Sequence, residues 1–104
     1  METIEKTCEL LKANLLRMVP STMSLDKDDF EDDEYPNEGE TSIGIRHLGY
    51  WASNPYEQDY DWLHLEDTSV RAINSAVEKT SKESGREITW SQEEKCWIYF
   101  SIKN

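Results

Sequence analysis

Cys96-Trp97-Ile98-Tyr99-Phe100-Ser101-Ile102 is the stretch of sequence that sets the fold class, because its side chains alternate at the period of a β-strand. Trp97 and Tyr99 fall on one face of this strand, and Cys96, Ile98, Phe100 and Ile102 fall on the other. The strand is therefore apolar or aromatic on both faces. In a sheet covered by helices on one side only, one of these sets would be left uncovered by the helices. The aromatic residues would then either form an exposed platform or fill a second small core under the acidic loop at residues 20–40.

The residues before this stretch predict a hairpin. Residues 86–91 form its first strand, and the turn is expected around Gln92-Glu93-Glu94-Lys95. Counted from that turn, Ile88 and Trp90 share the face of Trp97 and Tyr99.

Two amphipathic helices are predicted from apolar residues at helical spacing. The first spans residues 3–18 and stops before Pro20. The second begins at Asp67 or Thr68 and runs to about Ser84, where Gly85 ends it. Residues 41–51 and 60–66 predict another hairpin between the two helices. The order is α-β-β-α-β-β, so we expect one α+β domain over residues 1–104, with a four-stranded antiparallel sheet and two helices packed on one face.

The negative charge is concentrated in one part of the chain. The 104 residues include 22 Asp and Glu against 11 Lys and Arg, for a net charge of −11. Residues 26–40, here called the acidic segment, hold nine of the acids and one base, a local charge of −8. We expect residues 20–40 to form a loop or linker, with at most one short helical turn. This segment is either a solvated linker or a contact surface whose carboxylates mimic phosphates, with Phe30 or Tyr35 as an anchor.

Metal and disulfide chemistry have little support in the sequence. The acidic segment begins like a calcium loop, but Phe30, Glu31 and Asn37 occupy the fifth, sixth and twelfth positions, where an EF-hand needs an oxygen ligand, Gly and Glu. His47 and His64 would face each other in the hairpin over residues 41–66, yet a zinc ion needs two more ligands. Cys8 and Cys96 are expected to be reduced thiols. No metal ion or cofactor is predicted.

Catalysis and membrane insertion are not expected either. Carboxylates such as Asp59, Asp61, Glu66 and Asp67 could pair as an acid and a base, but 22 carboxylates produce such pairs by chance. Gly-rich phosphate loops and nucleophile elbows are absent from the sequence, so the chain is not predicted to be an enzyme. No stretch reaches the roughly 20 apolar residues of a membrane span, and we expect a cytoplasmic protein.

These features predict a protein partner. The excess of acid repels nucleic acids and anionic membranes, so direct binding to either is not expected, and the predicted partner is a basic nuclease or nucleic-acid-binding protein. The predicted contact residues are Asp26, Asp28, Asp29, Phe30, Glu31, Asp32, Asp33, Glu34, Tyr35, Trp90, Trp97 and Tyr99.

The leading hypothesis for function is a small acidic inhibitor of the immunity or antitoxin type that occludes the active site of its basic partner. An alternative is a phage or mobile-element inhibitor of a host nuclease defence, either anti-restriction or anti-CRISPR, that mimics nucleic acid. The confinement of the acid to one segment favours the first setting, because a mimic of duplex DNA would spread its carboxylates along a long surface. A second alternative is an adaptor or regulatory subunit that binds through an aromatic sheet face.

Overall fold

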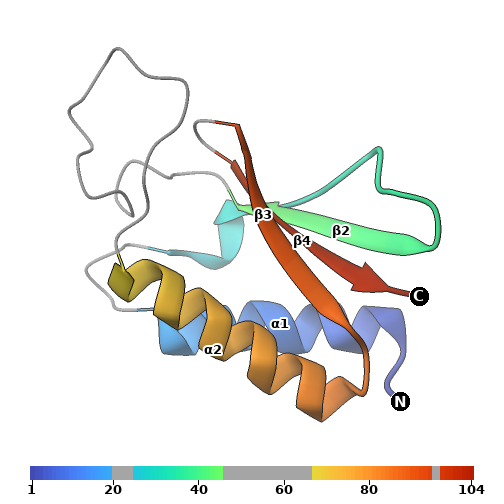
Figure 1. The fold of residues 1–104 in the computed structure, drawn as a ribbon, viewed down its shortest axis with the longest axis horizontal. Coiled ribbons are helices and arrows are strands. Elements are labelled where there is room, and N and C mark those ends of the chain that lie inside the picture. The colour runs from blue at the N-terminus through green and yellow to red at the C-terminus, as the bar shows by residue number, and fades with distance from the viewer. Residues whose placement is uncertain (20–24, 46–66, 95–96) are drawn as a thin grey trace.

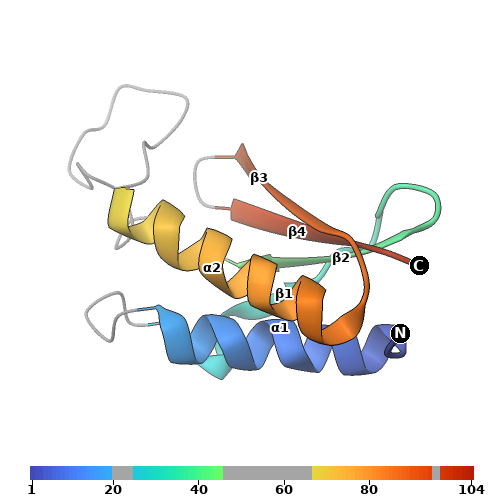
Figure 2. The same cartoon turned by 60° about the horizontal axis from the view of Figure 1, so that its bottom comes forward.

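Two helices and a four-stranded antiparallel sheet form two layers (Figure 1). The computed structural model describes residues 1–19, 25–45, 67–94 and 97–104. Their elements are α1 (Ile4–Met18), the 3-10 turn η2 (Lys27–Asp29), β1 (Phe30–Asp32), β2 (Glu40–Ile45), α2 (Asp67–Ser84), β3 (Ile88–Glu94) and β4 (Trp97–Lys103). Both helices lie on the same side of the sheet (Figure 2). The predicted α+β class and the order of its elements are therefore confirmed.

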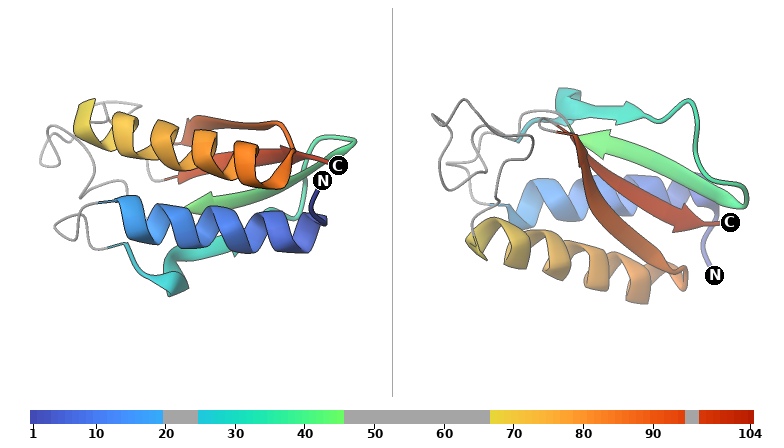
Figure 3. Two further views of the ribbon diagram at one scale, coloured as in Figure 1. Left: turned by 90° about the horizontal axis from the view of Figure 1, so that it is seen from below. Right: turned by 45° about the horizontal axis from the view of Figure 1, so that its top comes forward.

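The strands are arranged in the order β1-β2-β4-β3 (Figure 3). Ile43 of β2 lies opposite Phe100 of β4, and Ile45 lies opposite Ile98. These side chains face the helices and are almost completely buried, against Leu11 of α1 and residues of α2. We call this side the inner face and the opposite side the outer face. Removing these apolar side chains from water is the main stabilising contribution to the fold.

Both predicted helices are present with nearly the predicted bounds. The Thr3 hydroxyl caps α1 by accepting a hydrogen bond from the backbone N–H of Lys6 at 3.1 Å. Gly85 follows α2 with a φ of 74°, and its N–H donates to the Ser81 carbonyl at 2.9 Å. A left-handed residue after the last turn satisfies helix carbonyls that would otherwise lack partners, and Gly takes that conformation at the lowest cost.

The hairpin of β3 and β4 differs from the prediction in register. Ile88 pairs with Ile102 and Trp90 pairs with Phe100, so both side chains belong to the inner face and not to the face of Trp97. Glu94 pairs with Trp97, so the strands continue closer to the C-terminus than the predicted turn allowed. The register also shifts between Gln92 and Glu94, and a shift by an odd number of residues exchanges the two faces of a strand. The inner position also gives the Trp90 indole N–H a partner, the Asn74 side-chain oxygen at 2.8 Å.

The pairing of β2 with β1, on the side of β2 away from β4, was also not predicted. β2 pairs with β4 on one side and with β1 on the other, so the first strand of the sheet and the connection that follows it lie within the acidic segment. The expected loop does contain one helical turn, η2, but residues 30–32 are a strand because Phe30 packs against the core. The predicted strand over residues 60–66, His47 and His64, and the residues 46–51 lie outside the described residues.

Candidate functional site

Two aromatic side chains occupy the outer face of the sheet. The rings of Trp97 and Tyr99 are stacked, with centroids 5.6 Å apart and planes inclined by 10°. Both side chains are half-buried. Their place on the outer face agrees with the alternation in the sequence, and their large flat rings make this part of the sheet apolar at its centre.

Gly44 makes room for this aromatic pair. It lies opposite Tyr99 across β2 and β4, on the outer face. A Cβ atom at this position would come within 2.8 Å of Tyr99 Cε1 and 3.2 Å of Trp97 Cε3. The two rings therefore lie directly over the backbone of β2. Sequence reasoning missed this role, although a glycine inside a predicted strand is a known signal of close approach.

The chain after β1 is fixed at the border of the outer face. The Asp33 N–H donates to the Ser42 carbonyl at 3.0 Å, which continues the pairing of β1 with β2. The Asp33 carboxylate oxygen Oδ1 accepts a hydrogen bond from the Tyr35 N–H at 3.0 Å, the geometry of an Asx turn. Gly39, with a φ of 76°, accepts a hydrogen bond from the Asn104 N–H at 3.0 Å. These contacts hold the carboxylate of Asp33 beside the sheet.

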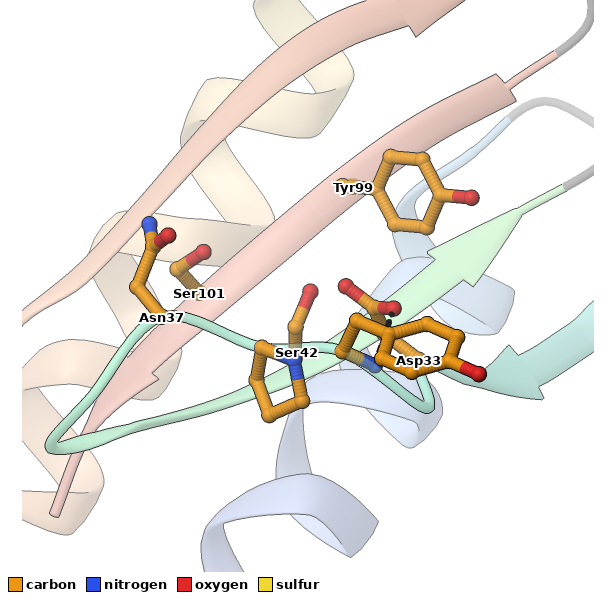
Figure 4. A pocket seen from close by; sticks show the side chains of 7 residues that line it. Asp33, Asn37, Ser42, Tyr99 and Ser101 are labelled. Carbon is orange, nitrogen blue, oxygen red and sulfur yellow. Dashed lines mark hydrogen bonds between the residues drawn. The ribbon is translucent and has the colours of Figure 1, made fainter.

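Two neighbouring pockets lie between this turn and the aromatic pair. The first has a volume of about 310 Å³ and is lined by Asp33, Tyr35, Pro36, Asn37, Ser42, Tyr99 and Ser101 (Figure 4). The second has a volume of about 240 Å³ and is lined by Glu31, Asp32, Asp33, Glu34, Tyr35, Trp97 and Tyr99. Asp33, Tyr35 and Tyr99 line both. We call the two together the acidic-aromatic groove.

The groove brings together seven of the predicted contact residues, namely Glu31, Asp32, Asp33, Glu34, Tyr35, Trp97 and Tyr99. Among the residues that the structure describes, no basic side chain lines either pocket. Such a surface can attract a cation through its carboxylates and stack it on an aromatic ring.

The other predicted contact residues lie elsewhere. Asp26, Asp28 and Asp29 belong to or flank η2, which lies beside α1 (Figure 3). There the Asp29 carboxylate accepts a hydrogen bond from the Asp26 N–H at 2.8 Å, so it stabilises the turn. Phe30 and Trp90 pack against the core on the inner face, and the expectation that Trp90 shares a surface with Trp97 is wrong.

The inner side of β1 carries a charged contact with α1. Lys12 lies 6.0 Å from the centre of the Phe30 ring. Next to it, Cys8 has a free thiol. Burial raises the pKa of this thiol above its ordinary value of 9.0, with smaller contributions from the negative charges of Asp32 and Glu5, while Lys12 opposes the shift. A raised pKa makes the thiol a poor nucleophile near neutral pH.

Among the described residues, no group of three or more His, Cys, Asp or Glu side chains is arranged to hold a metal ion. Neither α1 nor α2, the two helices of those residues, combines the length and the apolar character that a membrane-spanning helix needs. No protein-family model matches the chain, and no curated protein is significantly similar to it in sequence.

Proposed function

We propose that the chain is a small acidic inhibitor of the immunity or antitoxin type, which binds a basic nuclease or another basic nucleic-acid-binding protein and occludes its active site. One observation carries this proposal: carboxylates of the acidic segment and the stacked rings of Trp97 and Tyr99 line one groove. A cytoplasmic setting is part of the proposal, and the free thiol of Cys8 is compatible with a reducing compartment.

The two halves of the groove have complementary tasks in such a complex. Carboxylates attract a basic surface over a distance and occupy positions where its nucleic-acid phosphates would bind. Aromatic side chains supply the contact area that slows dissociation, because Trp and Tyr are enriched among the residues that dominate binding energy. A nuclease active site is rich in cations and open to a polyanion, so it matches both features.

The adaptor alternative is weaker because it treats the acidic segment as a solubilising linker. Residues 30–33 are instead hydrogen-bonded to β2, and Asp33 borders the aromatic pair. A nucleic-acid mimic directed at a host nuclease defence would use the same groove, but with the acid confined to one segment the immunity setting remains the favoured one.

The experiment is affinity capture from a lysate of the native host at low salt, followed by a salt step, mass spectrometry and a nuclease assay with the purified partner. We expect capture of a basic nucleic-acid-handling protein, release by salt because exposed charges are screened, and loss of its activity when the chain is added at equal concentration. A neutral partner that stays bound through the salt step would contradict the proposal and favour the adaptor.

A matched pair of variants locates the binding surface. Glu31→Gln, Asp33→Asn and Glu34→Gln together remove three charges from the groove, and we expect at least about tenfold weaker inhibition because charge-assisted contacts are lost. The control variant Glu5→Gln, Glu9→Gln and Glu78→Gln removes three charges from exposed positions on the two helices. An equal loss of inhibition in both variants would show that only the net charge matters. Inhibition equal to that of the parent in both would show that these charges do not matter. Either result would overturn the assignment of the groove.

A further inference from the structure

A serine places its hydroxyl group in the first pocket of the groove. Ser42 is only 6% exposed and lines the pocket. In the part of the chain that the structure describes, its side chain makes no hydrogen bond, and it lies among the side chains that line the pocket (Figure 4). Because the hydroxyl opens onto the pocket and is not engaged by another described side chain, a ligand bound there can form a hydrogen bond with it.

The other walls define what kind of ligand would fit. The Asp33 carboxylate adds a negative charge, and only its Oδ1 is used by the Tyr35 N–H. Ser101 adds a second hydroxyl, and the ring of Tyr99 borders the same space (Figure 4). The pocket therefore offers several acceptor oxygens, one negative charge and an aromatic ring within about 310 Å³. Because ligand pockets begin at roughly 300 Å³, this volume suits a single side chain more than a larger molecule.

We propose that this pocket binds the guanidinium group of an arginine side chain from the partner. A guanidinium is planar, carries its N–H donors in a fixed fork that matches a carboxylate, and stacks on aromatic rings. In this complex, the Asp33 carboxylate pairs with the positive charge of the guanidinium. The hydroxyl oxygens of Ser42 and Ser101 accept hydrogen bonds from its other N–H groups, and the Tyr99 ring provides the stacking surface. A lysine ammonium can also form an ion pair with Asp33. It cannot stack on the ring or form two parallel hydrogen bonds with the carboxylate, so the pocket discriminates between the two cations. That this arginine belongs to a basic nuclease rests on the proposed function. That the pocket prefers a guanidinium group does not depend on it.

The experiment is a titration of the isotope-labelled chain with the peptide acetyl-Gly-Arg-Gly-amide, followed by nuclear magnetic resonance at low salt, with acetyl-Gly-Lys-Gly-amide as the matched probe. We expect the arginine peptide to shift the backbone signals of Asp33, Ser42 and Tyr99 and to bind at least about fivefold more tightly than the lysine peptide. Equal binding of the two peptides, or shifts spread over all acidic positions, would overturn the proposal.

Two substitutions test the named contacts. Asp33→Asn removes the charge but keeps an oxygen for the Tyr35 N–H, so the turn is preserved, and we expect about tenfold weaker binding of the arginine peptide. Ser42→Ala should weaken it by a smaller factor. Glu78→Gln, on the exposed side of α2, removes the same charge and should leave the affinity unchanged. If Asp33→Asn binds the arginine peptide as well as the parent does, the pocket is not the site.

The outcomes separate this inference from the proposed function. Capture of a basic nuclease together with no preference for the arginine peptide would keep the inhibitor function and overturn the arginine pocket. Selective binding of the arginine peptide together with a neutral, salt-resistant partner would keep the pocket and overturn the inhibitor function.

Discussion

At the scale of single residues, the groove depends on the absence of a Cβ atom at Gly44. Gly44 is an ordinary strand residue in its pairing, and Ala would suit a strand better than Gly does. It is the two rings above it that exclude a Cβ atom. The smallest residue of β2 thus sets how closely the largest side chains of β4 approach the backbone.

We expect Gly44→Ala to lower the free energy of unfolding by about 1–3 kcal/mol, as overpacking commonly does. The cause is the predicted 2.8 Å approach of the new Cβ atom to Tyr99 Cε1, which forces the ring aside. Urea denaturation gives the stability, and near-ultraviolet circular dichroism reports the stacked rings. Gly39→Ala is the control, because no described residue other than its two chain neighbours comes within 4 Å of the added Cβ, and only backbone strain at φ 76° remains. An unchanged spectrum for Gly44→Ala would contradict this account.

Cys8 predicts a dependence of stability on alkaline pH. Because its pKa is raised in the folded state, the folded chain holds the thiol proton more tightly than the unfolded chain. The resulting stabilisation is fully present below pH 9.0, the ordinary value, and is lost as the pH rises through the raised pKa. Urea midpoints measured across this range should fall more steeply for the parent than for Cys8→Ala. Lys103, whose pKa is raised chiefly by a hydrogen bond with Glu87, titrates alike in both proteins and cancels in the comparison.

At the scale of elements, sequence patterns predicted the helices better than the strands. A helix carries a stripe that repeats over fifteen or more residues, so Ile4–Met18 and Asp67–Ser84 could be located to within about a residue. A strand as short as β1 has three residues, two of them acidic, and no periodicity to detect. Its existence depends on a tertiary event, the packing of Phe30 against the core.

The candidate site could be predicted only in part, for a related reason. Alternation in β4 placed Trp97 and Tyr99 correctly, since a strand of seven residues fixes its own faces. The face of Trp90 depended on the register between two strands, which an irregularity near Gln92 changed. The roles of Ser42 and Gly44 could not be predicted, because they come from what lies across the sheet and not from their own sequence context.

The contact between α1 and α2 contains a buried polar group with a testable role. Asn14 is 3% exposed, and its side-chain N–H groups donate to Thr80 Oγ1 and Glu83 Oε1, both at 2.9 Å. Its carbonyl oxygen accepts a hydrogen bond from Arg17. We expect Asn14→Ala to lower the free energy of unfolding by about 1–3 kcal/mol, because several buried hydrogen bonds lose their shared partner. Thermal or urea unfolding measures it.

Glu9→Ala is the control for this contact. Glu9 lies on the same helix but is exposed, so its replacement should change the free energy of unfolding by less than about 0.5 kcal/mol. Equal effects of the two substitutions would mean that Asn14 contributes only helix propensity.

At the scale of the whole molecule, the helices and the acidic-aromatic groove lie on opposite faces of the sheet. The helices cover the inner face (Figure 2). The acidic-aromatic groove lies on the outer face, where Trp97 and Tyr99 line it. With a net charge of −11 on 104 residues, the folded chain also repels itself. Dense negative charge thus has a cost in stability, which binding to a basic partner would relieve.

Salt should therefore stabilise this protein. We expect the melting temperature to rise by roughly 4–8 °C between low and physiological salt if screening relieves about 1 kcal/mol of repulsion. The exposed ion pairs Lys82–Glu78 and Lys103–Glu87 oppose this only weakly. The triple variant of the groove at Glu31, Asp33 and Glu34 should show a smaller rise than the triple variant of the helices, because its charges lie in the densest cluster. A melting temperature that falls with added salt would refute the expectation.

The rings above Gly44 also carry an evolutionary consequence. A strand position where two neighbouring rings crowd an added Cβ atom changes by itself only at a cost in stability. A relative with Ala or a larger residue at position 44 should carry a smaller side chain at position 99, position 97 or both, and its groove would be shallower. Joint variation of these three positions would therefore indicate which descendants of this fold have kept the aromatic surface and which have lost it.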